Sequence, residues 1–135
     1  MTQGGLVRRA DETKRKQLFY DRIAGSFDAV MNRYDLERRL AVVFERFLSA
    51  EEVRGRTLLD VGCGTGWFAR QALAMGAQVI AFDIGTNLLK RVREKCAARL
   101  VAGDACALPF GTASLDLVVS SECIEHTLDP YKALR

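Results

Sequence analysis

The stretch that decides the fold is LLDVGCGTGWFARQALAMG, which runs from Leu58 to Gly76. Apolar residues lead into an acid, Asp60, and glycines then occupy every second position at 62, 64 and 66. A pattern typical of an amphipathic helix follows and ends at Gly76. Glycines permit a sharp turn and a close approach of a ligand to the backbone, and the start of a helix offers free N–H groups. The stretch therefore predicts a buried strand, a ligand-binding loop and a helix.

The length of 135 residues is sufficient for one domain with its own core. Hydrophobic residues make up 49% and charged residues 27%, which is typical of a folded globular protein. The net charge is +3, from 20 basic and 17 acidic residues, and the excess lies within the first 20 residues. Because acids are interleaved with these cations, we interpret them as a solvated helix face and expect no nucleic-acid partner.

The sequence lacks the patterns of targeting segments, membrane spans and metal sites. The sequence shows neither the apolar run of a signal peptide nor that of a membrane span, which predicts a cytoplasmic protein. The four cysteines lack C-x-x-C spacing and His126 is the only histidine, so we expect free thiols and no metal site.

Strand and helix patterns alternate on both sides of the glycine loop. An amphipathic helix is expected between Leu36 and Leu48, and a helix is expected to start at Pro130 with Asp129 as its N-cap. Strands are predicted at 57–62, 77–83, 98–104 and 115–121, with helices at 67–75 and 86–97 and a loop at 107–114. This alternation predicts an α/β, Rossmann-like, doubly wound fold with a mostly parallel sheet and helices on both faces.

Polar residues mark the carboxyl ends of the predicted strands, where such sheets bind ligands. The dinucleotide fingerprint is G-x-G-x-x-G, whereas this chain has G-x-G-x-G with Asp60 two residues before the first glycine. A negative charge there disfavours a pyrophosphate and suits an ammonium or sulfonium group. Asp83 stands about where an acid that binds a ribose diol is expected, although an acid that caps the next helix is the alternative. These residues predict an adenosine-like ligand with a cationic tail.

Four ordered segments resemble the motifs of class I S-adenosylmethionine-dependent methyltransferases: LLDVGCGTGWFA, VIAFDIG, VAGDACALPF and DLVVSSECIEHTLDP. The resemblance covers roughly residues 57–131. In addition, LFYDRIAGSFDAVMNRYDLERR resembles the N-terminal lid segment of the ubiquinone/menaquinone-biosynthesis methyltransferases. The resemblance implies an N-terminal helical lid at 1–50, the first part of a methyltransferase domain at 51–135, S-adenosyl-L-methionine as cofactor and a small-molecule methyl acceptor.

The resemblance also implies a role for single residues. Asp60 and the glycine loop, Gly62, Cys63, Gly64 and Gly66, face the methionine portion of the cofactor, with Cys63 contributing its backbone. Asp83 takes the ribose hydroxyls and Ile84 packs on the adenine. Asp104 and the N–H of Ala105 bind the adenine edge, and carbonyls near Ser120 and Ser121 complete the methionine pocket. Relatives carry tyrosine in A-x-x-Y-D where this chain has Phe27, so Tyr20 or Tyr34 is a candidate substitute.

The reaction implied is direct displacement at the sulfonium methyl, aligned by the protein in a site that excludes water. His126, just beyond the fourth strand, is the candidate general base; the alternative is that it orders its loop. Glu122 and Glu125 are further acids nearby and are expected to be structural or solvated. Trp67 and Phe68 are expected in the core, and the Phe19, Ile23 and Phe27 stripe is expected to be a packed helix face rather than the underside of a lid.

Strand number separates two functional hypotheses. Complete members of the fold have seven strands in the order 3-2-1-4-5-7-6, whereas four are predicted here, so we expect a domain that is truncated at its C-terminus. A partner chain or a further C-terminal segment would then cover the edge of strand four. The first hypothesis is a methyltransferase, and the second is a truncated, non-catalytic module that binds cofactor or a partner. A nicotinamide-dependent dehydrogenase is disfavoured by the glycine spacing.

Overall fold

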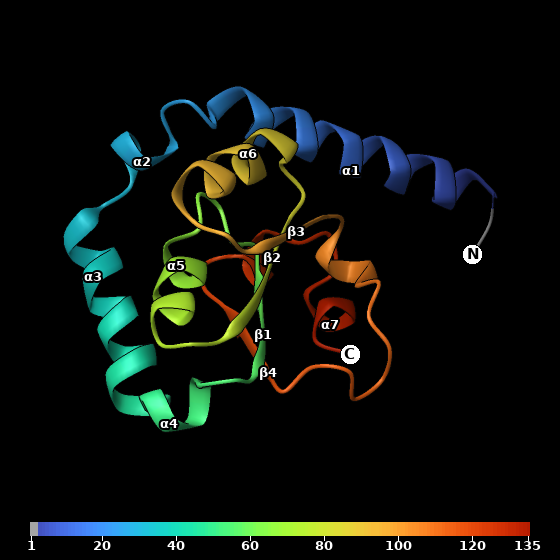
Figure 1. The fold of residues 1–135 in the computed structure, drawn as a ribbon. Helices are drawn as coiled ribbons and strands as arrows, with labels where there is room; N and C mark the ends of the chain where they lie inside the picture. The colour runs from blue at the N-terminus through green and yellow to red at the C-terminus, as the bar shows by residue number, and fades with distance from the viewer. Residues whose placement is uncertain (1–2) are drawn as a thin grey trace.

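A computed structural model describes residues 3–135 of the chain and contains one parallel sheet of four strands (Figure 1). The strands are β1 (Thr57–Val61), β2 (Gln78–Asp83), β3 (Arg99–Ala102) and β4 (Leu117–Ser120). They lie in the order β3-β2-β1-β4, and every neighbouring pair is parallel. The predicted α/β fold is confirmed, and the order agrees with the first half of the order expected from the resemblance.

The two central strands are buried on both faces, which explains their nearly continuous apolar sequences. In β1, Leu59 pairs with Ile80 of β2 and with Val118 of β4, so the hydrophobic residues of successive strands lie in register. The outer strands β3 and β4 are only partly buried, and Val118 is 58% exposed. Within the described residues, β4 forms the open edge that was expected.

Different types of segment cover the two faces of the sheet. Helices α5 (Trp67–Ala74) and α6 (Thr86–Lys95) pack on one face, together with α3 (Arg33–Ala41). The other face carries the short helices η2 (Ala105–Ala107) and α7 (Pro130–Ala133), with Phe110 and Leu115 of the intervening loop packed on β1 and β2 (Figure 1). Helical segments thus lie on both faces, as predicted, and those of the second face are short.

The N-terminal segment crosses the carboxyl ends of the strands. Helix α1 (Gln3–Ile23) runs over α6, and α2 (Phe27–Val30) follows after a turn (Figure 1). This turn separates Phe27 from Phe19, which is 57% exposed, so the expectation of one packed helix face with Phe19, Ile23 and Phe27 is wrong. The break comes at Ala24–Ser26, where the Ser26 N–H bonds to the carbonyl of Ile23 and closes a turn.

Several boundaries differ from the prediction. The helix expected between 36 and 48 divides into α3 and the π-helix η1 (Val42–Phe47), and α4 (Ala50–Val53) forms where the helix was expected to end. Ser49 starts α4 through a capping box with Glu52, a local signal that the prediction did not use. Helix α7 begins as predicted, with Pro130 in its first turn and Asp129 accepting a hydrogen bond from the Lys132 N–H.

All four cysteines are free thiols in the described part of the chain, as predicted. Within residues 3–135, no helix is long and apolar enough to cross a membrane. Among the same residues, no three His, Cys, Asp or Glu side chains are grouped so that they could hold a metal ion.

Candidate functional site

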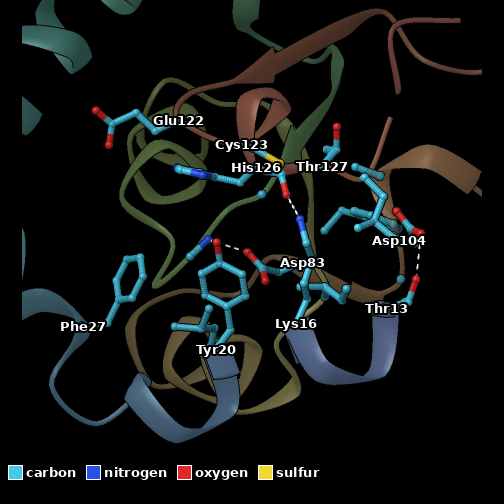
Figure 2. A pocket seen from close by; sticks show the side chains of 18 residues that line it. Thr13, Lys16, Tyr20, Phe27, Asp83, Asp104, Glu122, Cys123, His126 and Thr127 are labelled. Atoms are coloured by element: carbon cyan, nitrogen blue, oxygen red, sulfur yellow. Dashed lines mark hydrogen bonds between the residues drawn. The ribbon is translucent and has the colours of Figure 1, made fainter. Parts of the chain in front are cut away.

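A pocket lies at the carboxyl ends of β1, β2 and β3, beneath helix α1 (Figure 2). The loop after β1 contributes Gly62 and Gly64, and the end of β2 contributes Asp83 and Ile84. The loops after β3 and β4 contribute Asp104, Ala105, Cys123 and His126. Segments far apart in the sequence therefore meet in one crevice because parallel strands end at the same edge of the sheet.

The glycine loop is shaped by close contacts from two sides. Gly62 and Gly64 have φ values of +72° and +54°, in the left-handed region that favours glycine. A Cβ atom on Gly62 would lie 2.4 Å from Cβ and Sγ of Cys123, and one on Gly64 would lie 3.1 Å from the Phe27 ring. These glycines leave room for the chain segments that wall the pocket, Phe27 from α2 and Cys123 from the loop after β4.

Asp83 is the buried acid at the centre of the pocket, with 6% of its surface exposed. Its two carboxylate oxygens accept hydrogen bonds from the N–H groups of Gly64, at 2.9 Å, and Gly85, at 2.8 Å. Burial raises the pKa of Asp83, while these backbone donors act against the rise. A carboxylate offers about four lone-pair positions, so Asp83 has acceptor capacity left for a ligand diol. Its hydrogen bond to Gly85 is a local structural contact. Asp83 does not cap α6 as the alternative required, since the Asn87 N–H in the first turn of α6 donates to Asp21 at 2.7 Å.

Tyr20 of α1 lines the same pocket. Its ring lies beside Asp83, and its hydroxyl points into the pocket (Figure 2). Burial and the charge of Asp83 raise the pKa of Tyr20, so the phenol stays protonated at neutral pH. Tyr34 is 67% exposed and its hydroxyl accepts a hydrogen bond from Arg38. Of the two tyrosines considered as substitutes at Phe27, Tyr20 is therefore the one that the fold brings to the site.

The predicted adenine end of the site carries Ile84, Asp104 and Ala105, which all line the pocket. One oxygen of Asp104 accepts from the Cys106 N–H at 2.9 Å, and the other from the Thr13 hydroxyl of α1 at 3.3 Å. Lys16, one turn further along α1, donates to the backbone carbonyl of His126. Helix α1 thus spans the mouth of the pocket from the end of β3 to the loop after β4.

Asp60 lies beneath the glycine loop instead of in the main pocket. Only 2% of its surface is exposed, and one carboxylate oxygen accepts from the Ala69 N–H in the first turn of α5 at 3.0 Å. Burial raises the pKa of Asp60 to about 7, with the Ala69 N–H acting against the rise and the charge of Asp83 adding to it. Asp60 lines a second cavity on the far side of Gly62 and Gly64.

This second cavity is lined by two of the other predicted methionine-side residues, Cys63 and Ser121, and also by Arg39 and Glu122. Burial raises the pKa of Cys63 well above its usual value, which makes its thiol unreactive. Gly66 and Ser120 line neither cavity among the described residues. Gly66 leaves room for Val92 of α6, and the Ser120 hydroxyl donates to the Val61 carbonyl at 3.1 Å.

The side chains of His126 and Glu122, both in the loop after β4, point in different directions (Figure 2). His126 lines the main pocket, whereas the side chain of Glu122 points away from its centre (Figure 2). Glu122 has a φ of +54°, a left-handed conformation that costs a non-glycine residue about 1–2 kcal/mol. Glu125 is exposed and borders an outer groove with Lys16 and His126.

A hydrogen-bond cluster that the sequence did not reveal joins the N-terminal segment to the glycine loop. Asp28 accepts from the hydroxyl of Thr65, from the indole N–H of Trp67 at 3.2 Å and from the ammonium of Lys95. Burial acts to raise the pKa of Asp28, yet these donors hold it below its usual value. Phe68 is buried as predicted, whereas Trp67 lies at the edge of the core, with Arg70 over its ring. Spacing could not reveal this cluster, because its partners lie 37 to 67 residues from Asp28.

Comparison with known proteins identifies the family of the chain. A family of methyltransferase domains matches residues 59–135. The chain is 34% identical to the malonyl-[acyl-carrier protein] O-methyltransferase of Serratia marcescens over 93% of its length and 49% of that protein. It is 33% identical to the demethylmenaquinone methyltransferase of Renibacterium salmoninarum, over 84% of this chain and 52% of that one.

Solved structures agree with these sequences. The crystal structure of an S-adenosylmethionine-dependent methyltransferase from Mesorhizobium loti matches 61% of this chain and 40% of that chain, with 31% identity and a TM-score of 0.57. The chain spans about half the length of the two curated relatives above. The family model covers more than half of the chain and the relatives are more than 30% identical to it, so the chain belongs to the methyltransferase domain family of class I, S-adenosylmethionine-dependent methyltransferases.

Proposed function

We propose that the chain binds S-adenosyl-L-methionine in the main pocket and directs its methyl group to a small-molecule acceptor. The observation that carries the proposal is the convergence of the glycine loop, Asp83 and Asp104 on one crevice. The family supports methyl transfer as the reaction class, and the pocket supports the cofactor.

The residues present suit an adenosine group. Asp83 keeps free acceptor positions for two ribose hydroxyls, and the side chains of Phe82, Ile84 and Leu88 provide apolar walls for a base. Asp104 can accept a hydrogen bond from an exocyclic amine when the amine replaces the Thr13 hydroxyl as donor. This fit to a nucleoside, with an acid beneath the loop at Asp60, favours a cationic cofactor tail over a pyrophosphate.

The bound cofactor would supply an electrophilic methyl group on sulfonium sulfur. The chain aligns the acceptor for in-line attack and excludes water, and α1 and Phe27 provide the cover over the pocket. His126 is the proposed general base for an acceptor that must lose a proton, since it lines the pocket. Tyr20, which stays protonated, is suited to donate a hydrogen bond and not to accept the proton.

The acceptor is proposed only as a class. The names of the two relatives specify different acceptors, a malonyl group on a carrier protein and a demethylmenaquinone, so their common step is methyl transfer. The helical segment 1–50 is proposed as the lid over the site, because Thr13, Lys16, Tyr20 and Phe27 all come from it. Cytoplasmic localisation remains a prediction.

The decisive experiment is calorimetric titration of the purified chain with S-adenosylmethionine, with NADH as the control ligand. Saturable binding of S-adenosylmethionine that is lost in Asp83→Ala supports the proposal, whereas NADH binding or no binding by a folded chain contradicts it. Replacing His126 by Gln tests the base separately. A kcat lowered about 10²- to 10⁴-fold, with a changed pH profile and unchanged cofactor affinity, is expected for a general base.

A further inference from the structure

Arg39 is the one cation that lines the second cavity, among the described residues. It lies on α3, one turn beyond Leu36, whose side chain is buried in the core. The helix is therefore anchored against the sheet, and Arg39 follows on the same side at i+3. Only 24% of the Arg39 side chain is exposed, although the residue comes from the N-terminal segment.

Hydrogen bonding holds the guanidinium at the carboxyl end of β4. Nη1 of Arg39 donates to Oγ of Ser121 at 2.9 Å, and the same nitrogen lies 3.5 Å from Oε2 of Glu122. On its other side, Nε donates to Oδ2 of Asp35 at 3.1 Å. The planar group is thus oriented by a serine of the site and by two acids.

The second cavity adjoins the main pocket at the glycine loop. Phe27, Gly62, Gly64 and Glu122 line both spaces. Of these two spaces, the acids Asp83 and Asp104 line the main pocket alone, whereas Asp60 and Arg39 line the second one alone. A ligand whose nucleoside occupies the main pocket would extend its tail past Gly62 and Gly64 toward Asp60 and Arg39.

The charges of this cavity match a zwitterion. The carboxyl of Asp60 offers a partner to an ammonium group, and the fork of Arg39 offers paired N–H donors to a carboxylate. The present partners of Arg39 are exposed, with 51% of the Asp35 and 59% of the Glu122 side chain accessible. Ion pairs with exposed carboxylates contribute little, so Arg39 can exchange one of them for a ligand at small cost.

We infer that Arg39 is a specificity-determining residue that binds the α-carboxylate of the amino-acid tail of the cofactor, while Ser121 holds its guanidinium in place. The inference rests on the proposed function and adds to it a residue that no motif identified. Helix α3 would then bind the cofactor directly through Arg39. Cofactor binding would in this way stabilise the position of the N-terminal segment on the sheet.

The test compares two ligands that differ in one carboxylate. S-adenosylmethionine and its decarboxylated form, which keeps the sulfonium and the amine, are titrated into the wild type, Arg39→Gln and Arg38→Gln. Arg38 is the matched control, since it lies on the same helix, is exposed, and donates to the Tyr34 hydroxyl without contacting the strand ends. A charge-assisted hydrogen bond predicts a loss of about 10- to 100-fold in S-adenosylmethionine affinity for Arg39→Gln.

The expected pattern is specific. Arg39→Gln binds both ligands with the weak affinity that the wild type shows for the decarboxylated ligand, and Arg38→Gln behaves as the wild type. Equal affinity of the wild type for the two ligands overturns the inference, even if Arg39→Gln fails to fold. An equal loss with both ligands indicates a structural role, and unchanged S-adenosylmethionine affinity in Arg39→Gln assigns the guanidinium to an acceptor carboxylate instead; either result overturns it. Failure of the folded wild type to bind either ligand contradicts the proposed function itself.

Discussion

The carboxylate of Asp83, at the end of β2, accepts a hydrogen bond from the N–H of Gly64 in the loop after β1, at 2.9 Å. The same side chain also accepts from Gly85, at 2.8 Å. One buried acid therefore sets the conformation of the glycine loop and faces the ligand pocket. Asp83 therefore combines a structural role with the proposed binding role.

Asp83→Ala leaves the N–H groups of Gly64 and Gly85 without their acceptor in a buried setting, which costs about 1–3 kcal/mol for each group. Asp83→Asn retains one carbonyl oxygen and should lower the free energy of unfolding less. Both variants should lose cofactor affinity, because each removes the acceptor pair for the ribose hydroxyls. Urea unfolding and calorimetry measure the two effects; equal stability of Asp83→Ala and the wild type would refute the structural part.

Gly62→Ala should destabilise the protein far more than Gly55→Ala. Both glycines have positive φ values, +72° and +74°, so each alanine carries a backbone cost of about 1–2 kcal/mol. A Cβ at Gly55 meets no atom within 4 Å, whereas one at Gly62 lies 2.4 Å from Cβ and Sγ of Cys123. Overpacking should add about 1–3 kcal/mol at Gly62 alone, measured by urea unfolding. Since Cys123→Ala retains the clashing Cβ, only Cys123→Gly should restore part of the stability of Gly62→Ala.

Asp28 and Thr65 should be energetically coupled, because the buried Thr65 hydroxyl donates to the Asp28 carboxylate. Asp28→Ala leaves this hydroxyl without a partner, and Thr65→Val removes the hydroxyl. A double-mutant cycle of unfolding free energies should give a coupling of about 0.5–3 kcal/mol. The exposed pair Arg33 and Glu37 on α3 is the reference, with a coupling expected below about 0.5 kcal/mol. Equal coupling in the two pairs would contradict a tie between α2 and the glycine loop.

Asp60 should make stability decrease as the pH rises. Its pKa is raised from the usual 3.8 to about 7 in the folded protein, because burial penalises the charged form. The folded state therefore holds a proton between about pH 4 and pH 7 that the unfolded state releases, so this contribution to stability is complete below pH 4 and is lost as the pH rises through 7.

The measurement is the free energy of unfolding of the wild type and Asp60→Asn at pH 5, 6, 7 and 8. Asn retains an oxygen for the Ala69 N–H but cannot titrate, so the variant should show a weaker fall in stability from pH 5 to pH 7. Asp83, whose pKa is also raised, contributes in the same direction in both proteins. Parallel pH profiles for the two proteins would exclude Asp60 as the source.

Local sequence patterns were sufficient for most of the fold. The apolar run of β1, the glycine spacing after it and the amphipathic pattern of α6 are properties of short segments, and each gave an element within a few residues of its predicted bounds. The boundaries that differ, at η1 and α4, depend on how the segment after α3 meets the sheet. Ser49 and Glu52 show that part of this difference was present in the sequence as a capping box.

The sequence by itself determined the parallel sheet, the glycine loop and the acids Asp83 and Asp104 at the strand ends, because side-chain period and the alternation of strands and helices follow from local chemistry. The strand order was expected only from the family resemblance. Only the tertiary structure decided that Asp60 lies beneath the loop, that Thr13 contacts Asp104 and that Arg39 contacts Ser121. The Arg39–Ser121 contact joins residues that are 82 positions apart in the sequence, and the Thr13–Asp104 contact joins residues that are 91 positions apart. No periodic sequence pattern predicts contacts over such separations. They arise from the packing of the N-terminal helices across the strand ends, which depends on the shape of the whole core.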